Sequence, residues 1–159
     1  MPQVSAGLLM YRRSAGALEY FLVHPGGPFF ARRDAGVWSI PKGEFGDGEE
    51  PLDVALREFH EETGRTADAC GATDFVALGS VRQPSGKLVH AWGFAGDWPD
   101  GLAVTSNTFE LEWPRGTGRV RTWPEVDDGR FFADDEARRR IIPAQAAFLD
   151  RLADHVERA

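Results

Sequence analysis

Residues 43–64 read GEFGDGEEPLDVALREFHEETG, and this stretch contains a well-bounded helix together with a concentration of acid. Pro51 suits the first position of a helix, where its missing N–H is no loss, and Gly64 suits the left-handed residue that ends a helix. At about 100° of turn per residue, one side of this helix is apolar. The members of the apolar side are Leu52, Ala55 and Phe59. The stretch therefore predicts a helix that packs on a core.

Three glutamates, Glu58, Glu61 and Glu62, share an arc of that helix beside its apolar side. Like charges three or four residues apart repel on a helix surface, by on the order of 0.2–0.5 kcal/mol per pair. We expect Arg57 to relieve part of this repulsion by pairing with Asp53 and Glu61. The arc is either a solvated acidic face with a salt bridge or a divalent metal site, because Mg²⁺ and Mn²⁺ prefer carboxylate oxygens. The preceding glycine-rich loop favours the metal site.

The spacing of these residues resembles the Nudix box, Gly-x5-Glu-x7-Arg-Glu-U-x-Glu-Glu-x-Gly-U, in which U is a bulky apolar residue. Phe59 fills the first U position, and Arg65 stands at the second, which is the one departure. The fixed positions are filled by Gly43, Glu49, Arg57, Glu58, Glu61, Glu62 and Gly64. The chain is therefore similar to the Nudix hydrolases, MutT-like enzymes that cleave nucleoside diphosphates linked to a further group. This resemblance implies an α/β/α sandwich with a mixed β-sheet and a catalytic loop–helix–loop.

The same resemblance implies roles for individual residues. Glu58 and Glu62 match the principal metal ligands, and Glu61 matches a further ligand, direct or through water. Glu58 is alternatively the general base. Arg57 is expected to orient the carboxylates, and the Gly43 carbonyl to join the metal shell after a tight turn. The residues expected to shape the loop and helix are Gly43, Glu49, Phe59 and Gly64. The implied cofactor is Mg²⁺ or Mn²⁺.

Clues to the substrate lie outside the box. Residues 38–43, WSIPKG, resemble the Trp-x-x-Pro-Lys-Gly segment of the diadenosine tetraphosphate hydrolases, in which the lysine meets the polyphosphate. Lys42 is expected to do the same here, and the alternative is an exposed loop charge. Glu125 precedes a segment ending in aromatic residues, as in that subgroup. It is expected to be an outer metal ligand or an acid/base group, or else a surface acid beside Asp127 and Asp128.

Other polar and aromatic residues are weaker candidates. Glu110 and Glu112 share one face of a predicted strand, so one of them could complete the metal site. Aromatic side chains that could stack on a base, with Trp92 and Phe148 preferred, are Phe29, Phe30, Trp92 and Phe148.

The composition describes an acidic chain of ordinary apolar content. With 159 residues, one domain spanning 1–159 is expected, long enough to bury a core. The net charge of −7 argues against duplex DNA as a partner. An acidic protein and an anionic small nucleotide would repel each other, and a metal ion between them would remove this apparent contradiction. Short apolar runs and an N-terminus unlike a signal peptide predict a cytoplasmic protein without a membrane span. Cys70, the single cysteine, excludes an internal disulfide, and a monomer or a homodimer is compatible with the sequence.

The remaining chain predicts short strands separated by turns. The expected strands are 4–12, 19–24, 37–40, 75–82, 88–95, 108–113 and 130–133. A tail helix is expected from about Asp134 and is interrupted at Pro143, after which Phe148 and Leu152 mark an apolar side. Short strands with a central and a C-terminal helix suggest a mixed α/β sheet covered on both faces.

Three functions are compatible with these residues. The first is a metal-dependent pyrophosphohydrolase of a dinucleoside polyphosphate, with a nucleoside triphosphate, oxidised forms included, or an RNA 5′ end as alternative substrates. The second is a nucleotide-binding or protein-binding domain without catalysis, but degenerate members of the family lose box glutamates and all four are present here. The third is an isomerase of the isopentenyl diphosphate type, which requires a suitably placed cysteine. Cys70 is expected in a loop after the box, so this third function is disfavoured.

Overall fold

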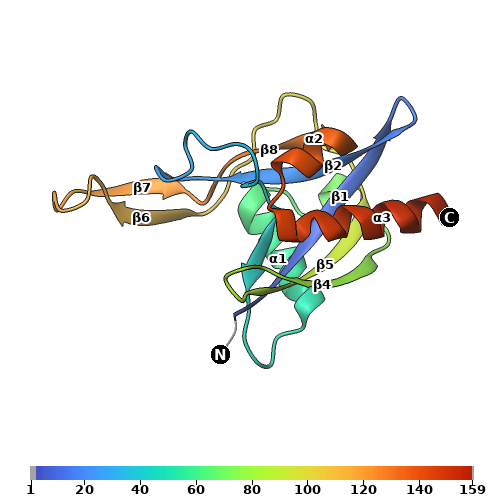
Figure 1. Ribbon diagram of the computed structural model, residues 1–159, viewed down its shortest axis with the longest axis horizontal. Helices are drawn as coiled ribbons and strands as arrows, with labels where there is room; N and C mark the ends of the chain where they lie inside the picture. The colour runs from blue at the N-terminus through green and yellow to red at the C-terminus, as the bar shows by residue number, and fades with distance from the viewer. Residues whose placement is uncertain (1–2, 159) are drawn as a thin grey trace.

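The computed structural model describes residues 3–158 and is built around one mixed β-sheet (Figure 1). The sheet order is β4-β5-β1-β2-β8, and β3 pairs with β1 beside this path. The strands of this sheet are β1 (Val4–Ser14), β2 (Ala17–Pro25), β3 (Lys42–Glu44), β4 (Val76–Arg82), β5 (Leu88–Ala95) and β8 (Val126–Ala133). β1 is central: it runs parallel to β5 and antiparallel to β2 and β3.

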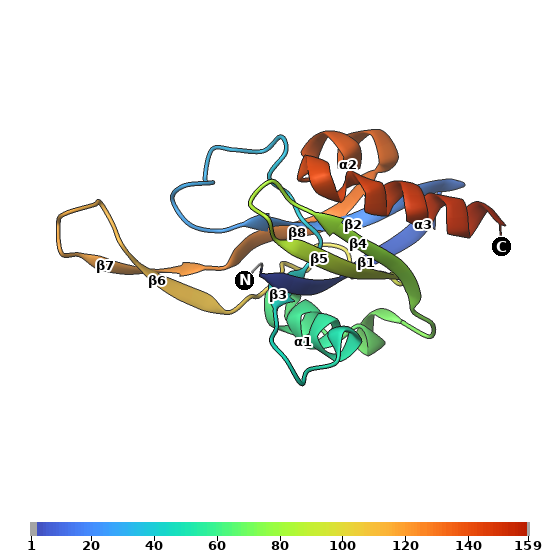
Figure 2. The same ribbon diagram turned by 60° about the horizontal axis from the view of Figure 1, so that its bottom comes forward.

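Helices cover both faces of the sheet (Figure 2). α1 (Pro51–Thr63) lies on one face, and α2 (Asp134–Arg140) and α3 (Ala146–Arg158) lie on the other. Successive residues of β1 alternate between the two cores: Leu8 and Met10 pack with α1, and Leu9 packs with α3. β1 is therefore buried without interruption from residue 5 to residue 10, as expected of a strand covered on both faces. The predicted α/β/α sandwich is confirmed.

α1 has the limits that the sequence predicted. Pro51 begins it, and Gly64 ends it with a φ of 90°, its N–H donating to the carbonyl of His60 at 2.8 Å. Phe59 is fully buried and meets the ring of Phe94 at 5.5 Å between centroids. Because these contacts fix the helix against the sheet, its acidic arc has a defined position.

A two-stranded hairpin, β6 (Thr108–Glu112) and β7 (Val120–Pro124), extends away from the sandwich (Figures 1 and 2). Sequence patterns predicted β6 but missed β7 and β3. The strand predicted over 37–40 is wrong, because this segment makes only isolated bridges, Val23 with Ser39 and Trp38 with Ile141. Two short 3-10 helices, Asp68–Cys70 and Pro143–Gln145, complete the described chain. None of the helices within residues 3–158 has the length and apolarity needed to cross a bilayer.

Candidate active site

A polar pocket of about 350 Å³ forms where α1 passes β3 and the base of the hairpin. Its lining comes from six separate parts of the chain and combines carboxylates with both lysines of the sequence. The lining residues are Ser5, Lys42, Gly43, Glu44, Glu58, Glu61, Glu62, Lys87, Asn107 and Glu125. The structure thus brings together the box glutamates of α1 with two residues predicted from outside the helix, Lys42 and Glu125.

Gly43 allows α1 to approach the sheet closely. A Cβ at this position would lie 2.0 Å from Cδ of Glu58 and 2.4 Å from each of its carboxylate oxygens. Gly43 itself is in β3, opposite Ala6 of β1, in an extended conformation. The predicted tight turn at Gly43 is therefore wrong, and the glycine serves instead to leave room for a carboxylate against the backbone.

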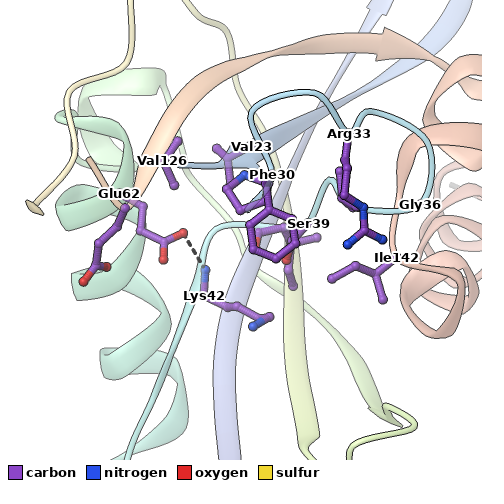
Figure 3. Close-up of a pocket in the computed structure, with 13 residues that line it drawn as sticks. Val23, Phe30, Arg33, Gly36, Ser39, Lys42, Glu62, Val126 and Ile142 are labelled. Carbon is purple, nitrogen blue, oxygen red and sulfur yellow. Dashed lines mark hydrogen bonds between the residues drawn. The ribbon is translucent and has the colours of Figure 1, made fainter. Parts of the chain in front are cut away.

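Glu62 is held against the same strand. Its Oε1 accepts a hydrogen bond from the backbone N–H of Lys42 at 3.2 Å (Figure 3). Burial raises the pKa of Glu62 to about 8, although the N–H and charge of Lys42 oppose this, and the carboxylates of Glu58 and Glu125 add to the rise. The same crowding acts on Glu58, whose pKa is raised first by burial and then by Glu61.

These carboxylates fit a divalent cation in chemistry, and their present arrangement is strained by repulsion that a cation relieves. Ser5 adds a second sign of a missing polar partner, because its hydroxyl is fully buried in the pocket wall and makes no hydrogen bond within the described chain. Among residues 3–158 no three acidic, imidazole or thiol side chains are already grouped at the spacing of a closed metal cage. A divalent cation held by three of these carboxylates would therefore require them to lie closer together than they do here.

Arg57 and Glu49 connect the loop to the helix. Glu49 accepts hydrogen bonds from the N–H of Gly46 at 3.1 Å and from Arg57 at 3.0 Å, and these two bonds, in that order, lower the pKa of Glu49. Arg57 also lies 3.9 Å from both Glu58 and Glu61. The expected pair of Arg57 with Asp53 is not among the ion pairs of the described chain. Glu49 thus braces the loop, and Arg57 stands beside the carboxylates.

A second, mainly apolar pocket of about 330 Å³ adjoins the polar one and shares Lys42, Glu62 and Glu125 with it. Its other lining residues are Val23, Pro25, Phe30, Arg33, Gly36, Val37, Ser39, Ile40, Val126 and Ile142. In Figure 3 the ammonium end of Lys42 extends away from the carboxylate of Glu62. Burial, followed by the positive charge of Lys87, lowers the pKa of Lys42. Because the two pockets share three lining residues, the charged half and the apolar half of the site lie side by side.

Several predicted site residues lie elsewhere. Phe148 is fully buried between α3 and the sheet, so it is not placed to stack on a ligand. Trp92 is partly buried against the core under α1 and lines neither pocket. Glu110 and Glu112 are on the projecting hairpin, also outside both pockets. Of the four aromatic candidates, the structure brings only Phe30 to the site.

Sequence reasoning missed most of the apolar lining and several polar lining residues, among them Ser5, Arg33, Glu44, Lys87 and Asn107. Lys87 could have been chosen as a candidate from the sequence. The chain contains sixteen arginines and only two lysines, and the other lysine, Lys42, was already a candidate. Ser5, Arg33 and Asn107 could not have been chosen in this way, since their positions depend on how distant segments pack.

Comparisons with known proteins agree with this geometry. The family model of the NUDIX domain matches residues 1–152. A nucleoside triphosphate pyrophosphatase/Nudix hydrolase fusion protein of Bifidobacterium longum is 28% identical over 94% of this chain, and an RNA pyrophosphohydrolase of Cereibacter sphaeroides is 38% identical over 57% of it. The matched regions span only 29% and 57% of those relatives.

A crystal structure of a C. elegans Ap4A hydrolase binary complex has the same fold, with a TM-score of 0.66 at 19% identity and 99% coverage of both chains. The family model covers nearly the whole chain, and the fold and the box of α1 agree with it. The chain belongs to the Nudix family.

Proposed function

We propose that this protein is a divalent-metal-dependent pyrophosphohydrolase that cleaves a phosphoanhydride bond in a nucleoside polyphosphate. One observation supports this most directly: the pocket with the crowded carboxylates and the apolar pocket are adjacent and share Lys42, Glu62 and Glu125. A nucleotide has the same division, since its phosphates are charged and its base is a flat ring. The apolar half is of the size and character that suit a small-molecule group.

Each half of the site has residues suited to its part of the substrate. Glu58, Glu61 and Glu62 would hold Mg²⁺ or Mn²⁺, with Glu125 and the Gly43 carbonyl as further ligands. The bound cation supplies neutralisation of phosphate oxygens and a more acidic water. Lys42 and Lys87 would bind the phosphates from the opposite side, and Phe30 would contact the base.

The reaction is a direct displacement. A water oxygen attacks one phosphorus, the bridging P–O bond breaks, and the leaving phosphate keeps the bonding electron pair. A carboxylate accepts the proton of the water, and Glu58, Glu61 and Glu125 are the candidates for this base. Arg57 is a positioning residue, because it contacts Glu49, Glu58 and Glu61 and lines neither pocket.

A dinucleoside polyphosphate is the small substrate that Pro41-Lys42-Gly43 favours, and the fold of the C. elegans Ap4A hydrolase is compatible with it. The alternatives are a nucleoside triphosphate and an RNA 5′ end, the latter suggested by the Cereibacter relative. Turnover of diadenosine tetraphosphate, ATP and GTP under the same conditions, with products separated by chromatography, distinguishes the small substrates. A higher kcat/KM for a triphosphate would transfer the preference to it.

The catalytic proposal is tested with Glu62→Gln. This change keeps the hydrogen bond from Lys42 possible but removes a negative charge from the polar pocket, so turnover should fall by orders of magnitude while the circular dichroism spectrum stays unchanged. Glu110→Gln is the matched control, because it removes the same charge from the hairpin, outside both pockets. Near-normal turnover in Glu62→Gln would refute the assignment. A wild-type protein that binds nucleotide without product formation would be a binding domain.

A further inference from the structure

The β6–β7 hairpin, residues 108–124, is hereafter called the arm. It is the part of the described chain that projects furthest from the sandwich (Figure 1). A two-stranded hairpin has little stability of its own in water, and the sheet with its helices does not need this one for its cores. The catalytic proposal uses only residues at its base. Neither the packing of the cores nor the proposed catalysis therefore accounts for the arm.

The two faces of the arm differ in chemistry. The strand register places Phe109 opposite Trp123 and Leu111 opposite Arg121, so these side chains share one face. Glu110 lies on the other face. The aromatic face continues to the tip, where the N–H of Trp113 donates to the carbonyl of Arg119 at 2.9 Å, and Glu112 faces the opposite way. Aromatic rings and arginines thus occupy one face, and the glutamates occupy the other.

The arginines of the arm are available to an anion. Arg115, Arg119 and Arg121 are exposed, and within residues 3–158 none of them takes part in an ion pair. The six arginines that do pair with carboxylates lie elsewhere in the chain: Arg12, Arg57, Arg130, Arg138, Arg139 and Arg140. In a protein of net charge −7, the arm carries three arginines against two glutamates. Its aromatic face is consequently a cationic surface on an acidic molecule.

The loop that lines the apolar pocket packs on this same face. The ring of Phe29 meets Trp113 edge-on at 5.4 Å, and the guanidinium of Arg115 lies 5.6 Å from the centre of Phe29. Phe29 nevertheless keeps 48% of its surface exposed. Its neighbour Phe30 lines the apolar pocket. Phe29, next to Phe30 in the chain, is thus the exposed ring between the apolar pocket and the arm, whose own rings, Phe109, Trp113 and Trp123, are partly buried.

Backbone hydrogen bonds fix the base of the arm beside the carboxylates. The N–H of Asn107 donates to the carbonyl of Glu61 at 3.0 Å, and the N–H of Glu125 donates to the carbonyl of Asn107 at 2.8 Å. The N–H of Gly26 in turn donates to the carbonyl of Glu125 at 2.9 Å. A ligand lying on the arm is thereby held in register with the polar pocket.

We propose that the arm binds single-stranded oligonucleotide that continues from a polyphosphate end seated in the polar pocket. This inference rests on the proposed function: among the substrates named there it favours a polyphosphate end that continues as a nucleotide chain, and it assigns the binding of that chain to the arm. Arginines that meet successive phosphates, together with aromatic rings on which bases stack, are the features by which proteins bind single strands. Five strand residues extend about 17 Å, which exceeds what a single second nucleoside would occupy. The arm thus suits several nucleotides better than one.

The test compares one 5′-triphosphorylated mononucleotide with a short single-stranded RNA that carries the same 5′ end. For the wild-type protein, the KM for the RNA should be about tenfold below that for the mononucleotide. Arg119→Gln with Arg121→Gln should reduce this ratio to near one. The control is Arg13→Gln with Arg158→Gln, which removes the same charge from exposed positions outside the arm and should keep the wild-type ratio. Fluorescence anisotropy of the same RNA with a 5′-hydroxyl measures the arm without hydrolysis.

In that binding experiment, the slope of log affinity against log salt should be smaller by about 1.4 in the arm variant than in the control, because two phosphate contacts are lost. Equal KM values for the two substrates in the wild-type protein, or equal slopes in the two variants, would overturn the inference while leaving the proposed catalysis intact. Self-association that the arm variant abolishes, without any change in RNA binding, would also overturn it. Failure of the wild-type protein to hydrolyse either substrate would instead refute the proposed function.

Discussion

At the scale of single residues, the site depends on one backbone position that must lack a side chain. Gly43 has an ordinary extended conformation, so its freedom of rotation is not what the structure uses. Its value is the space that it leaves for the carboxylate of Glu58. A motif glycine can therefore be predicted from sequence, whereas its physical reason becomes visible only when the helix lies against the strand.

Gly43→Ala should lower turnover by about 100-fold, because an active-site group displaced by about 1 Å can have an effect of that size. The added methyl carbon would lie 2.0 Å from Glu58 Cδ, so either the carboxylate or the strand has to move. Gly46→Ala is the matched control: no atom lies within 4 Å of the added carbon, and the N–H bonded to Glu49 is kept. Steady-state kinetics and thermal unfolding of both variants provide the measurement. Equal activities would contradict the packing argument.

The raised pKa of Glu62 predicts how stability depends on pH without metal. Its folded-state pKa is about 8 against an ordinary value of 4.5, so between these limits the folded protein holds more protons than the unfolded chain. The contribution of this group to the free energy of unfolding therefore falls as pH rises from 4.5 to 8.

Urea unfolding in EDTA at several pH values across this window measures this contribution. As pH rises, the free energy of unfolding should fall less in Glu62→Gln than in the wild type. Glu110→Gln serves as the control. An identical pH dependence in the wild type and Glu62→Gln would contradict the assignment. Because a metal binds the ionised carboxylate, Mg²⁺ affinity should rise with pH over the same range.

At the scale of elements, the sequence predicted correctly those helices and strands whose limits depend on their own residues. α1 was predicted from Pro51 to Gly64 because its proline, its glycine and its apolar period all belong to the helix itself. β3 and β7 were missed, since each is short and gains its hydrogen bonds from a partner strand rather than from its own pattern. The segment 37–40 reads as a strand but is an extended link, which single bridges hold at Ser39 and Trp38.

This link leads into Lys42 and is fixed by Gln145 of the second 3-10 helix. The buried Oε1 of Gln145 accepts a hydrogen bond from the N–H of Ile40 at 3.1 Å, and its Nε2 donates to Ser39 Oγ and to Gln83 Oε1, each at 3.0 Å. Gln145→Leu leaves the N–H of Ile40 without a partner, which should destabilise the protein by about 1–3 kcal/mol.

The same variant should also raise KM more than it lowers kcat, because Ser39 and Ile40 line the apolar pocket. Chemical denaturation and steady-state kinetics measure the two effects. Gln83→Leu is the control, since it removes one partner of Gln145 and keeps the bond to Ile40. A Gln145→Leu protein with unchanged KM would show that the link holds its position without this residue.

At the scale of the whole molecule, composition alone indicated an acidic protein, which agrees with a cation that bridges it to an anionic ligand. The sandwich followed from the order of short strands and helices together with the family resemblance. The apolar pocket could not be predicted in this way. Its lining comes from β2, the loop after it, β8 and Ile142, and these segments meet only in the folded chain. The cationic arm could not be predicted either, because the net charge is a sum over the whole molecule and does not show where the arginines lie.

If the crowded carboxylates await a cation, then Mg²⁺ or Mn²⁺ should stabilise the fold as a whole. At about 100 times the dissociation constant, binding adds about 2.7 kcal/mol, which corresponds to a rise in Tm of about 5–10 °C for a chain of this length. Differential scanning calorimetry with and without metal measures the rise. Glu58→Gln with Glu62→Gln should abolish it, and Glu110→Gln should preserve it. A rise of equal size in all variants would place the cation elsewhere.

The position of α3 has a consequence for synthesis in the cell. Phe148, Leu149 and Leu152 of this last helix are fully buried against the sheet, yet no α3 residue lines either pocket. A nascent chain emerges from the ribosome N-terminal end first, so the face of the sheet opposite α1 stays uncovered until α2 and α3, residues 134–158, have been synthesised. Polypeptides that end just before residue 146 would therefore retain every box glutamate, expose the apolar surface that α3 covers, and be substrates for chaperones and proteases.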